Sequence, residues 1–353
     1  MSICETDVAV IGAGPVGLFA VFALGQVGLS AVVIDALHEA GGQCAALYPE
    51  KPIYDIPSRA SITGAALIED LLAQANSYAP DYRLGHSVRS LLGDNGRFDL
   101  GLSDGSQVRA GAVLIAAGAG AFGPNRPPLD GLAAYEGHSV FYSVRTASRF
   151  RNQHVVIAGG GDSAADWAVQ LAGIAASVTV IHRRSAFRAA PATMASIHLL
   201  AEENRIAVVA PGVLHGIEGD RSVLHAVLVD QGRGEIRRLP ADVLLCFFGL
   251  AKDVSAMASW QIGAGRDGIP VDPRSCETCR PGIYAIGDIA HYPGKLKLML
   301  TGFAEAAAAA HAARHRLRPD QAFHFEYSTA RGQPTKAAAA GHADPLLANF
   351  AAT

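Results

Sequence analysis

Residues 7–17 read DVAVIGAGPVG, an apolar run that leads directly into three glycines. The run is rich in branched side chains, which is typical of a buried parallel strand, and residues 18–27 then favour a helix. A second apolar run, residues 30–34, ends at Asp35. This order of strand, glycine turn, helix, strand and acid predicts a βαβ unit that binds a dinucleotide.

Each position of this turn has its own physical task. Gly12 permits the tight turn, Gly14 lets the backbone approach a pyrophosphate, and Gly17 lets helix and strand pack closely. Pro15 stands beside the start of the helix, whose N-terminus presents free N–H groups to phosphates. Asp35 follows at the distance where a carboxylate binds a ribose diol. The alternative is a packing turn that holds no ligand.

The same pattern recurs in mid-chain, where the apolar run 154–158 precedes GGGDSA. Residues 165–175 favour a helix, and residues 177–181 favour the next strand. A second nucleotide site is therefore predicted at the positions that fit G-x-G-x-x-A, which are Gly159, Gly161, Asp162, Ser163 and Ala164.

Basic residues follow the second βαβ strand, where the first has an acid. They are His182, Arg183, Arg184 and Arg188. A ribose that carries a 2′-phosphate needs cations, and the planar guanidinium fork matches phosphate geometry. The pattern predicts NADPH at this second site and FAD at the first. The alternative is a solvated basic turn.

Composition excludes several other classes of protein. The chain has 353 residues, half of them hydrophobic and 17% charged, with a formal net charge of -3. It is long enough for two or three domains, and the charge gives no sign of nucleic-acid binding. Residues 8–34 are apolar enough to suggest a membrane span, but their glycines have the more specific explanation given above. Five cysteines and no basic leader favour reduced thiols in a cytoplasmic protein.

A third element lies near the end of the chain. Residues 281–288 read as a strand that ends in Gly287 and Asp288, and an alanine-rich helix begins near Leu300. Residues 113–120 and 243–249 are further strands that end in small residues.

This ordered set resembles the two-domain flavoprotein reductases of the thioredoxin reductase type. The segments GGQCAALYPEK (41–51) and YPGKLKL (292–298) resemble, more narrowly, the ferredoxin or flavodoxin–NADP+ reductases built on that scaffold. The resemblance covers residues 5–330. It implies an α/β fold with two Rossmann-like, three-layer domains, the NADPH domain being inserted into the FAD domain. The implied boundaries are 1–120 with 251–330 for FAD, 121–250 for NADPH, and 331–353 for a C-terminal tail.

The resemblance also implies roles for residues around the flavin. Gln43 and Tyr48 would lie along the isoalloxazine, and Asp288 would contact the ribityl side. Val88 and Phe122 would contact the adenine side and the ring region. Tyr327, followed two residues later by Thr329, would cover the other face of the ring.

Cysteine placement separates this chain from the thioredoxin reductases. Those enzymes carry a redox C-x-x-C shortly before the second glycine motif, but residues 141–148 here read FYSVRTAS. Cys276 and Cys279 have C-x-x-C spacing elsewhere, where loop thiols are the favoured interpretation and a redox role the alternative. No metal site is predicted, because no further ligands have suitable spacing.

The leading hypothesis is therefore an NADPH-dependent reductase of ferredoxin or flavodoxin, in which the flavin and no particular side chain carries the chemistry. The alternatives are an NADPH oxidase, a disulfide reductase or a monooxygenase on the same scaffold, or a non-enzymatic flavin redox sensor. The resemblance implies a homodimer. Because such carriers are acidic, docking predicts a basic patch, and the candidates are Arg145, Arg149 and Arg151, or Lys295 and Lys297. The alternative for both groups is ordinary solvated charges.

Overall fold

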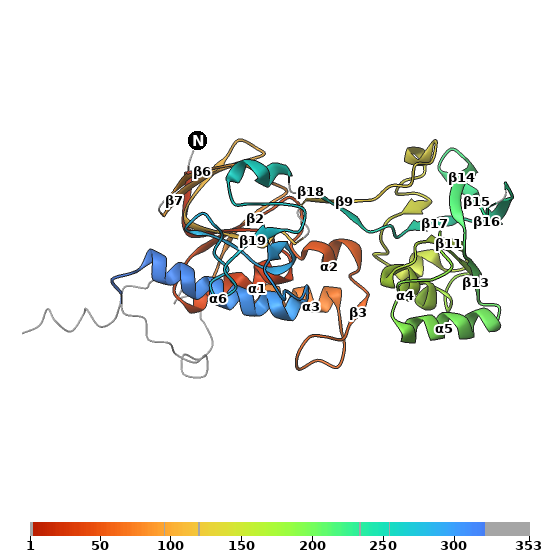
Figure 1. The fold of residues 1–353 in the computed structure, drawn as a ribbon, viewed down its shortest axis with the longest axis horizontal. Coiled ribbons are helices and arrows are strands. Elements are labelled where there is room, and N and C mark those ends of the chain that lie inside the picture. The colour runs from red at the N-terminus through yellow and green to blue at the C-terminus, as the bar shows by residue number, and fades with distance from the viewer. Residues whose placement is uncertain (1–2, 95, 119–120, 233, 254, 322–353) are drawn as a thin grey trace, which may run out of the picture. The chain divides into compact units, whose positions relative to one another are not determined.

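The computed structural model describes residues 3–94, 96–118, 121–232, 234–253 and 255–321 (Figure 1). They form two compact units, one from the chain up to Ala121 together with the chain from Lys252 onward, the other from Phe122–Ala251. The second unit is thus inserted in the sequence of the first. This mixed α/β architecture with parallel sheets confirms the predicted fold class.

A seven-stranded sheet forms the centre of the first unit. Its strands are β1 (Ile3–Ile11), β2 (Ala31–Asp35), β5 (Asp81–Leu84), β6 (Val88–Asp94), β7 (Arg97–Leu102), β8 (Gln107–Ile115) and β20 (Ile283–Ala285). The order is β5-β2-β1-β8-β7-β6, and β20 pairs with the end of β8. β1 pairs in parallel with β2 and β8, whereas β7 pairs antiparallel with residues 107–110 of β8. Residues 113–115 of β8 pair in parallel with β20.

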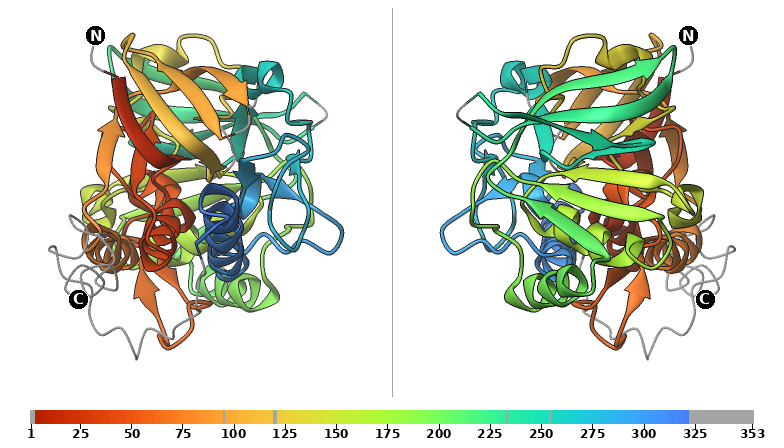
Figure 2. Two further views of the ribbon diagram at one scale, coloured as in Figure 1. Left: turned by 90° about the vertical axis from the view of Figure 1, so that its left-hand side faces the viewer. Right: turned by 90° about the vertical axis from the view of Figure 1, so that its right-hand side faces the viewer.

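Helices cover one face of this sheet. They are α1 (Pro15–Gln26), α3 (Gly64–Asn76) and α6 (Met299–Leu317), with the short α2 (Gly42–Leu47) nearby. Figure 2 shows α1 and α6 side by side. Residues of β1 alternate between the two faces, as the period of a strand requires. Val8 and Val10 pack with the helices, while Ala9 and Ile11 pack with β6, β7 and the 3₁₀ helix η3 (Ser255–Trp260).

The inserted unit is also built around a parallel sheet, and both faces of that sheet are covered. The sheet has the order β10-β17-β11-β12-β13, with β10 (Val140–Phe141), β11 (His154–Ala158), β12 (Ser177–Ile181), β13 (Ile206–Val209) and β17 (Val243–Cys246). One face packs against α4 (Asp162–Leu171) and α5 (Pro191–Glu202). The other packs against an antiparallel sheet of β14 (Val213–Asp220), β15 (Val223–Asp230) and β16 (Ile236–Pro240).

Short elements complete the fold. Among the described residues, two-stranded ribbons are formed by β3 (Pro52–Ile53) with β4 (Ile62–Thr63), β9 (Ala121–Pro124) with β18 (Leu250–Asp253), and β19 (Ile269–Pro270) with β21 (Ala290–His291). The remaining 3₁₀ helices are η1 (Leu132–Ala134), η2 (Ala147–Phe150) and η4 (Gly287–Ile289).

Helix starts differ from the sequence-based bounds. α1 begins at Pro15 rather than Leu18, because proline fits the first helical position, where its missing N–H costs nothing. α4 begins at Asp162 rather than Ala165. The strand expected over residues 281–288 is divided into β20 and η4. Residues 8–34 form the β1–α1–β2 unit, and no helix in the described part of the chain is long and apolar enough to cross a bilayer.

Candidate functional site

The first glycine turn joins β1 to α1 at close range. Gly12 has φ of +112°, and a Cβ on it would lie 2.4 Å from the carbonyl oxygen of Ala116. A Cβ on Gly17 would lie 1.9 Å from the carbonyl oxygen of Gly12. Side chains are therefore excluded at both positions by the protein itself, as predicted for the turn and for helix packing.

Gly14 differs from its two neighbours because the space beside it is open. A Cβ there would meet only the Cα of Gly42, at 3.9 Å. No side chain caps the N-terminus of α1, so its first N–H groups remain available to an anion. The pair Gly41 and Gly42 faces this opening, and the N–H of Gly41 donates to the carbonyl of Ala13 at 2.8 Å. Sequence reasoning did not assign this second glycine loop to the cradle.

Asp35 lies at the end of β2, beside the same turn. Its Oδ2 accepts a hydrogen bond from the N–H of Ala13 at 2.6 Å, and its Oδ1 accepts one from Leu37 at 2.8 Å. Burial raises the pKa of Asp35, and the two N–H donors oppose that rise. The oriented carboxylate keeps further lone pairs that can accept from the hydroxyls of a ribose.

The Gly-Asp turn and α6 meet the start of α1. Gly287 has φ of +71°, and a Cβ on Gly302 would lie 2.4 Å from Cγ2 of Val16. Asp288 is exposed although Gly287 and Ile289 on either side are buried. Burial raises the pKa of Tyr48, and Cys44 and Asp288 raise it further.

The structure locates some of the remaining residues of the predicted flavin site. A Cβ on Gly118, just beyond the end of β8, would lie 3.8 Å from the Nε2 of Gln43. Val88 begins β6 and is 6% exposed within the core. Phe122 lies in β9, and its side chain is not among the described atoms. Tyr327 and Thr329 lie outside the described residues.

The second glycine turn also combines a closely packed glycine with an open one. A Cβ on Gly159 would lie 2.7 Å from the carbonyl oxygen of Phe247 and 2.9 Å from Cβ of Ala164. A Cβ on Gly161 would meet nothing within 4 Å. Ala164 is buried, whereas Asp162 and Ser163 are exposed at the start of α4. Close packing thus surrounds an open position at the N-terminus of α4.

The basic residues lie directly beside this second turn. The N–H of Arg188 donates to the carbonyl of Gly160 at 2.7 Å, and the side chains of Arg183, Arg184 and Arg188 are exposed. His182 is 8% exposed, and its ring packs against Gly160. Burial lowers the pKa of His182, and the three arginines lower it further. Positive charge at this turn therefore comes from guanidinium groups.

Cys276 and Cys279 do not form a disulfide. Cys276 is fully buried, and burial raises the pKa of its thiol to about 12. Cys279 is exposed, and its Sγ lies 3.6 Å from the carbonyl oxygen of Gln261. A buried thiol with a raised pKa is a poor nucleophile. In the described part of the chain, no cluster of three or more His, Cys, Asp or Glu side chains could hold a metal ion.

Conversion of Cys276 and Cys279 to serine is therefore expected to leave flavin reduction by NADPH within about 2-fold of the unmodified rate, since neither thiol is suited to exchange electrons. Stopped-flow absorbance of the flavin measures that rate. A loss of tenfold or more in this rate or in carrier turnover, with the fold intact, would show that the thiols lie on the electron path.

One predicted docking residue is corrected by the structure. The side chain of Lys295 is 4% exposed and forms an ion pair with the side chain of Glu305, which is 5% exposed. It offers no charge to a partner, so the prediction of a docking role for Lys295 is wrong. A lysine in the sequence indicates a solvated surface. The carboxylate that pairs with Lys295 belongs to Glu305 on α6, so the sequence around Lys295 does not reveal the pair. Lys297 is exposed.

A glycine turn at a helix N-terminus in each of two units is typical of proteins that bind two dinucleotides. The chain belongs to the pyridine nucleotide-disulphide oxidoreductase family, whose model matches residues 6–313.

Comparison with solved structures and relatives agrees with this class. The thioredoxin reductase of T. acidophilum is 25% identical, with a TM-score of 0.76 over 88% of this chain and 98% of that structure. The thioredoxin reductase of Lactococcus lactis has the same TM-score at 23% identity, over 89% and 99% of the two chains. The ferredoxin–NADP reductase of Paramagnetospirillum magneticum is 55% identical over 94% of this chain and 98% of its own. That of Granulibacter bethesdensis is 56% identical over 94% and 95%.

Proposed function

We propose that this protein is an FAD-containing ferredoxin–NADP reductase that transfers electrons between NADPH and ferredoxin or flavodoxin. The observation that carries the proposal is a pair of glycine cradles with opposite charge beside them, Asp35 at one and Arg183 with Arg184 at the other. The names of relatives more than 50% identical over nearly the whole chain support the same activity.

FAD suits the first cradle better than FMN. The open space at Gly14 and the uncapped start of α1 fit a pyrophosphate, and Asp35 fits the ribose of an adenosine. FMN has neither group. When bound, the flavin would supply the chemistry that accepts two electrons as a hydride and releases them one at a time. The protein's own residues bind and orient the two nucleotides, and no side chain is assigned as a general acid or base.

The acceptor is inferred from where the thiols are. Cys246 is the single cysteine between residues 122 and 251, and it is buried with its pKa raised to about 12. This unit therefore has no dithiol to receive electrons, which favours direct transfer to an external carrier over disulfide reduction. The proposal also includes a homodimer and a cytoplasmic location.

The test combines cofactor identification with a coupled assay. Flavin released by heat is separated by chromatography, and NADPH-dependent cytochrome c reduction is measured with and without ferredoxin or flavodoxin. The proposal expects FAD and a rate that depends on the carrier. Rapid NADPH oxidation by oxygen, a disulfide or an organic substrate, with no gain from a carrier, would favour another enzyme on this scaffold. Flavin that NADPH does not reduce would favour a sensor.

The carrier is expected to dock near Arg145 and Arg149. The guanidinium of Arg149 lies 4.3 Å from the centre of the Phe141 ring and donates to the carbonyl of Gly137 at 3.2 Å, so its charge is held in one place. Charge reversal of Arg145 and Arg149 to glutamate is expected to lower kcat/KM for the carrier by roughly tenfold at low salt and to flatten its salt dependence.

Ferricyanide is the control acceptor, because it needs no protein docking surface. Arg237→Glu, in β16 of the same unit, controls for a single charge reversal at another place. Carrier turnover by that variant, and ferricyanide turnover by the Arg145 and Arg149 variant, should show little change. Carrier turnover that responds neither to salt nor to the Arg145 and Arg149 reversals would exclude this docking surface and point to a small-molecule acceptor.

A further inference from the structure

A buried charged cluster lies directly beneath the Gly-Asp turn. The side chains of Lys295 and Glu305 are 4% and 5% exposed and form an ion pair. The Oε1 of Glu305 also accepts a hydrogen bond from the Tyr292 hydroxyl at 2.6 Å. Its Oε2 accepts one from the N–H of Gly287 at 2.7 Å. Burying an ion pair is costly unless its hydrogen bonds are satisfied, and here both carboxylate oxygens have protein donors.

The contact with Gly287 links this cluster to the candidate flavin site. Gly287 has φ of +71°, and its N–H is held by a carboxylate from one turn beyond Gly302 on α6. Asp288, the next residue, is exposed. The orientation of Asp288 thus depends on the preceding residue, Gly287, whose N–H is hydrogen-bonded to Glu305.

We propose that Glu305, held by Lys295 and Tyr292, is a positioning residue that orients the Gly287–Asp288 turn and so determines how tightly flavin binds. The proposal rests on the proposed function only in assuming that flavin binds the first unit. Glu305 acts through the turn, since its own side chain is buried behind it.

The groups around the Glu305 side chain all donate hydrogen bonds, so a carboxylate satisfies them and an amide does not. In Glu305→Gln one end of the amide is an NH₂ donor. If its oxygen keeps the Gly287 N–H, the NH₂ faces the ammonium of Lys295. If the amide flips, the NH₂ faces the Gly287 N–H instead. Replacing Lys295 by methionine as well removes the first conflict and leaves the amide oxygen on Gly287.

The experiment measures the dissociation constant of FAD from deflavinated protein by fluorescence, together with the melting temperature of that protein. Glu305→Gln and Lys295→Met are each expected to weaken FAD binding on the order of 100-fold, because each leaves a buried group facing an unmatched partner. The double variant Glu305→Gln with Lys295→Met is expected to bind FAD within about 5-fold of the unmodified protein.

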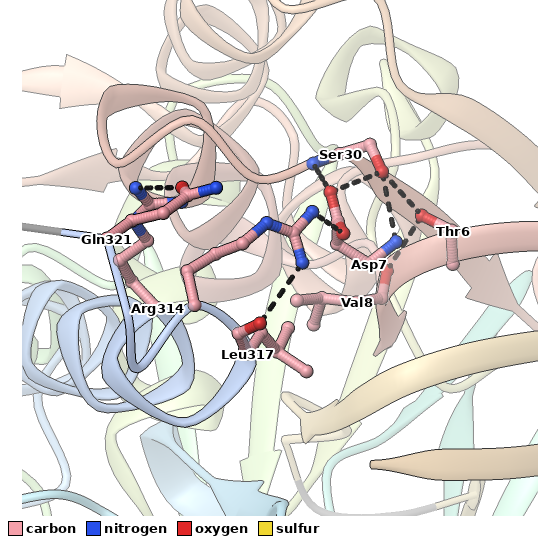
Figure 3. A network of polar contacts seen from close by, with 8 residues as sticks. Thr6, Asp7, Val8, Ser30, Arg314, Leu317 and Gln321 are labelled. Atoms are coloured by element: carbon pink, nitrogen blue, oxygen red, sulfur yellow. Dashed lines mark hydrogen bonds and ion pairs between the residues drawn. The ribbon is translucent and has the colours of Figure 1, made fainter.

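A second ion pair of the first unit gives a structural control, and its side chains are more exposed, at 34% for Arg318 and 22% for Asp7. Asp7, in the middle of β1, accepts hydrogen bonds from Ser30 (Figure 3) and pairs with Arg318 beyond the end of α6. Asp7 precedes the buried residues 8–11 of β1, and Gly12 follows the end of that strand. Arg318→Met is expected to lower the melting temperature and to leave FAD affinity within about 2-fold, because only the Glu305 pair touches the Gly-Asp turn.

Three results would overturn the proposal. The first is an unchanged FAD affinity in Glu305→Gln. The second is a double variant that binds FAD no more tightly than the weaker-binding single variant. The third is an Arg318→Met variant whose FAD affinity falls, for a given drop in melting temperature, as much as that of the Glu305 and Lys295 single variants. If the single variants do not fold, the double variant decides, and near-normal FAD affinity in it supports the proposal. An unmodified protein that binds no flavin would instead contradict the proposed function.

Discussion

Gly14→Ala is expected to give a folded protein that no longer retains flavin, and Gly161→Ala one that retains flavin but no longer binds NADPH. Both glycines have ordinary backbone angles, with φ of -72° and -103°. Added methyl groups meet nothing closer than 3.9 Å. The fold therefore tolerates alanine, while the methyl fills the space that a phosphate group needs. We expect each nucleotide's affinity to fall by about 100-fold or more.

Flavin absorbance and calorimetric titration with NADPH measure the two affinities, and circular dichroism checks the fold. Gly17→Ala is the contrasting variant, since its methyl would lie 1.9 Å from a backbone oxygen and is expected to prevent normal folding. If both Gly14→Ala and Gly161→Ala lost the same nucleotide, the assignment of one cradle to each nucleotide would be wrong.

Replacing Arg183 and Arg184 together by alanine is expected to raise the KM for NADPH and to leave that for NADH nearly unchanged. Both guanidinium groups are exposed beside the turn that carries Gly161, where a 2′-phosphate can accept charge-assisted hydrogen bonds from them. Losing two such contacts costs about 2–4 kcal/mol, which corresponds to roughly 30- to 1000-fold.

Steady-state kinetics with each coenzyme and ferricyanide measure this effect. The double variant Arg237→Ala with Arg238→Ala, from β16 of the same unit, removes the same charge and is expected to leave both KM values unchanged. An equal rise in KM for NADPH and NADH in the Arg183 and Arg184 variant would refute recognition of the 2′-phosphate.

The parts of the site that are local in sequence could be predicted well. Gly12, Gly14 and Gly17 lie within six residues of one another, and the strand, turn and helix around them follow from hydrophobic period and glycine spacing. The contrast between Asp35 and Arg183 could also be read directly, because each stands at the end of a strand whose position the glycines define.

Contacts between distant segments could not be predicted in this way. Gly42, the first residue of α2, approaches Gly14 from a separate segment, and the residues between them carry no signal of that approach. Lys295 gave the opposite expectation, because an isolated lysine indicates a solvated surface. Its burial depends on Glu305 from α6, which supplies a matching charge that only the folded chain brings near.

The position of β20 beside β8 has a consequence for synthesis on the ribosome. The first unit cannot complete its sheet, or cover α1 with α6, until the whole inserted unit has been translated. The inserted unit is contiguous and has its own two cores, so it can fold as soon as it emerges, ahead of the segment that precedes it. Until β20 and α6 arrive, the N-terminal segment exposes the apolar surface that they will cover. During that interval it is the part of the chain most open to chaperones and to aggregation.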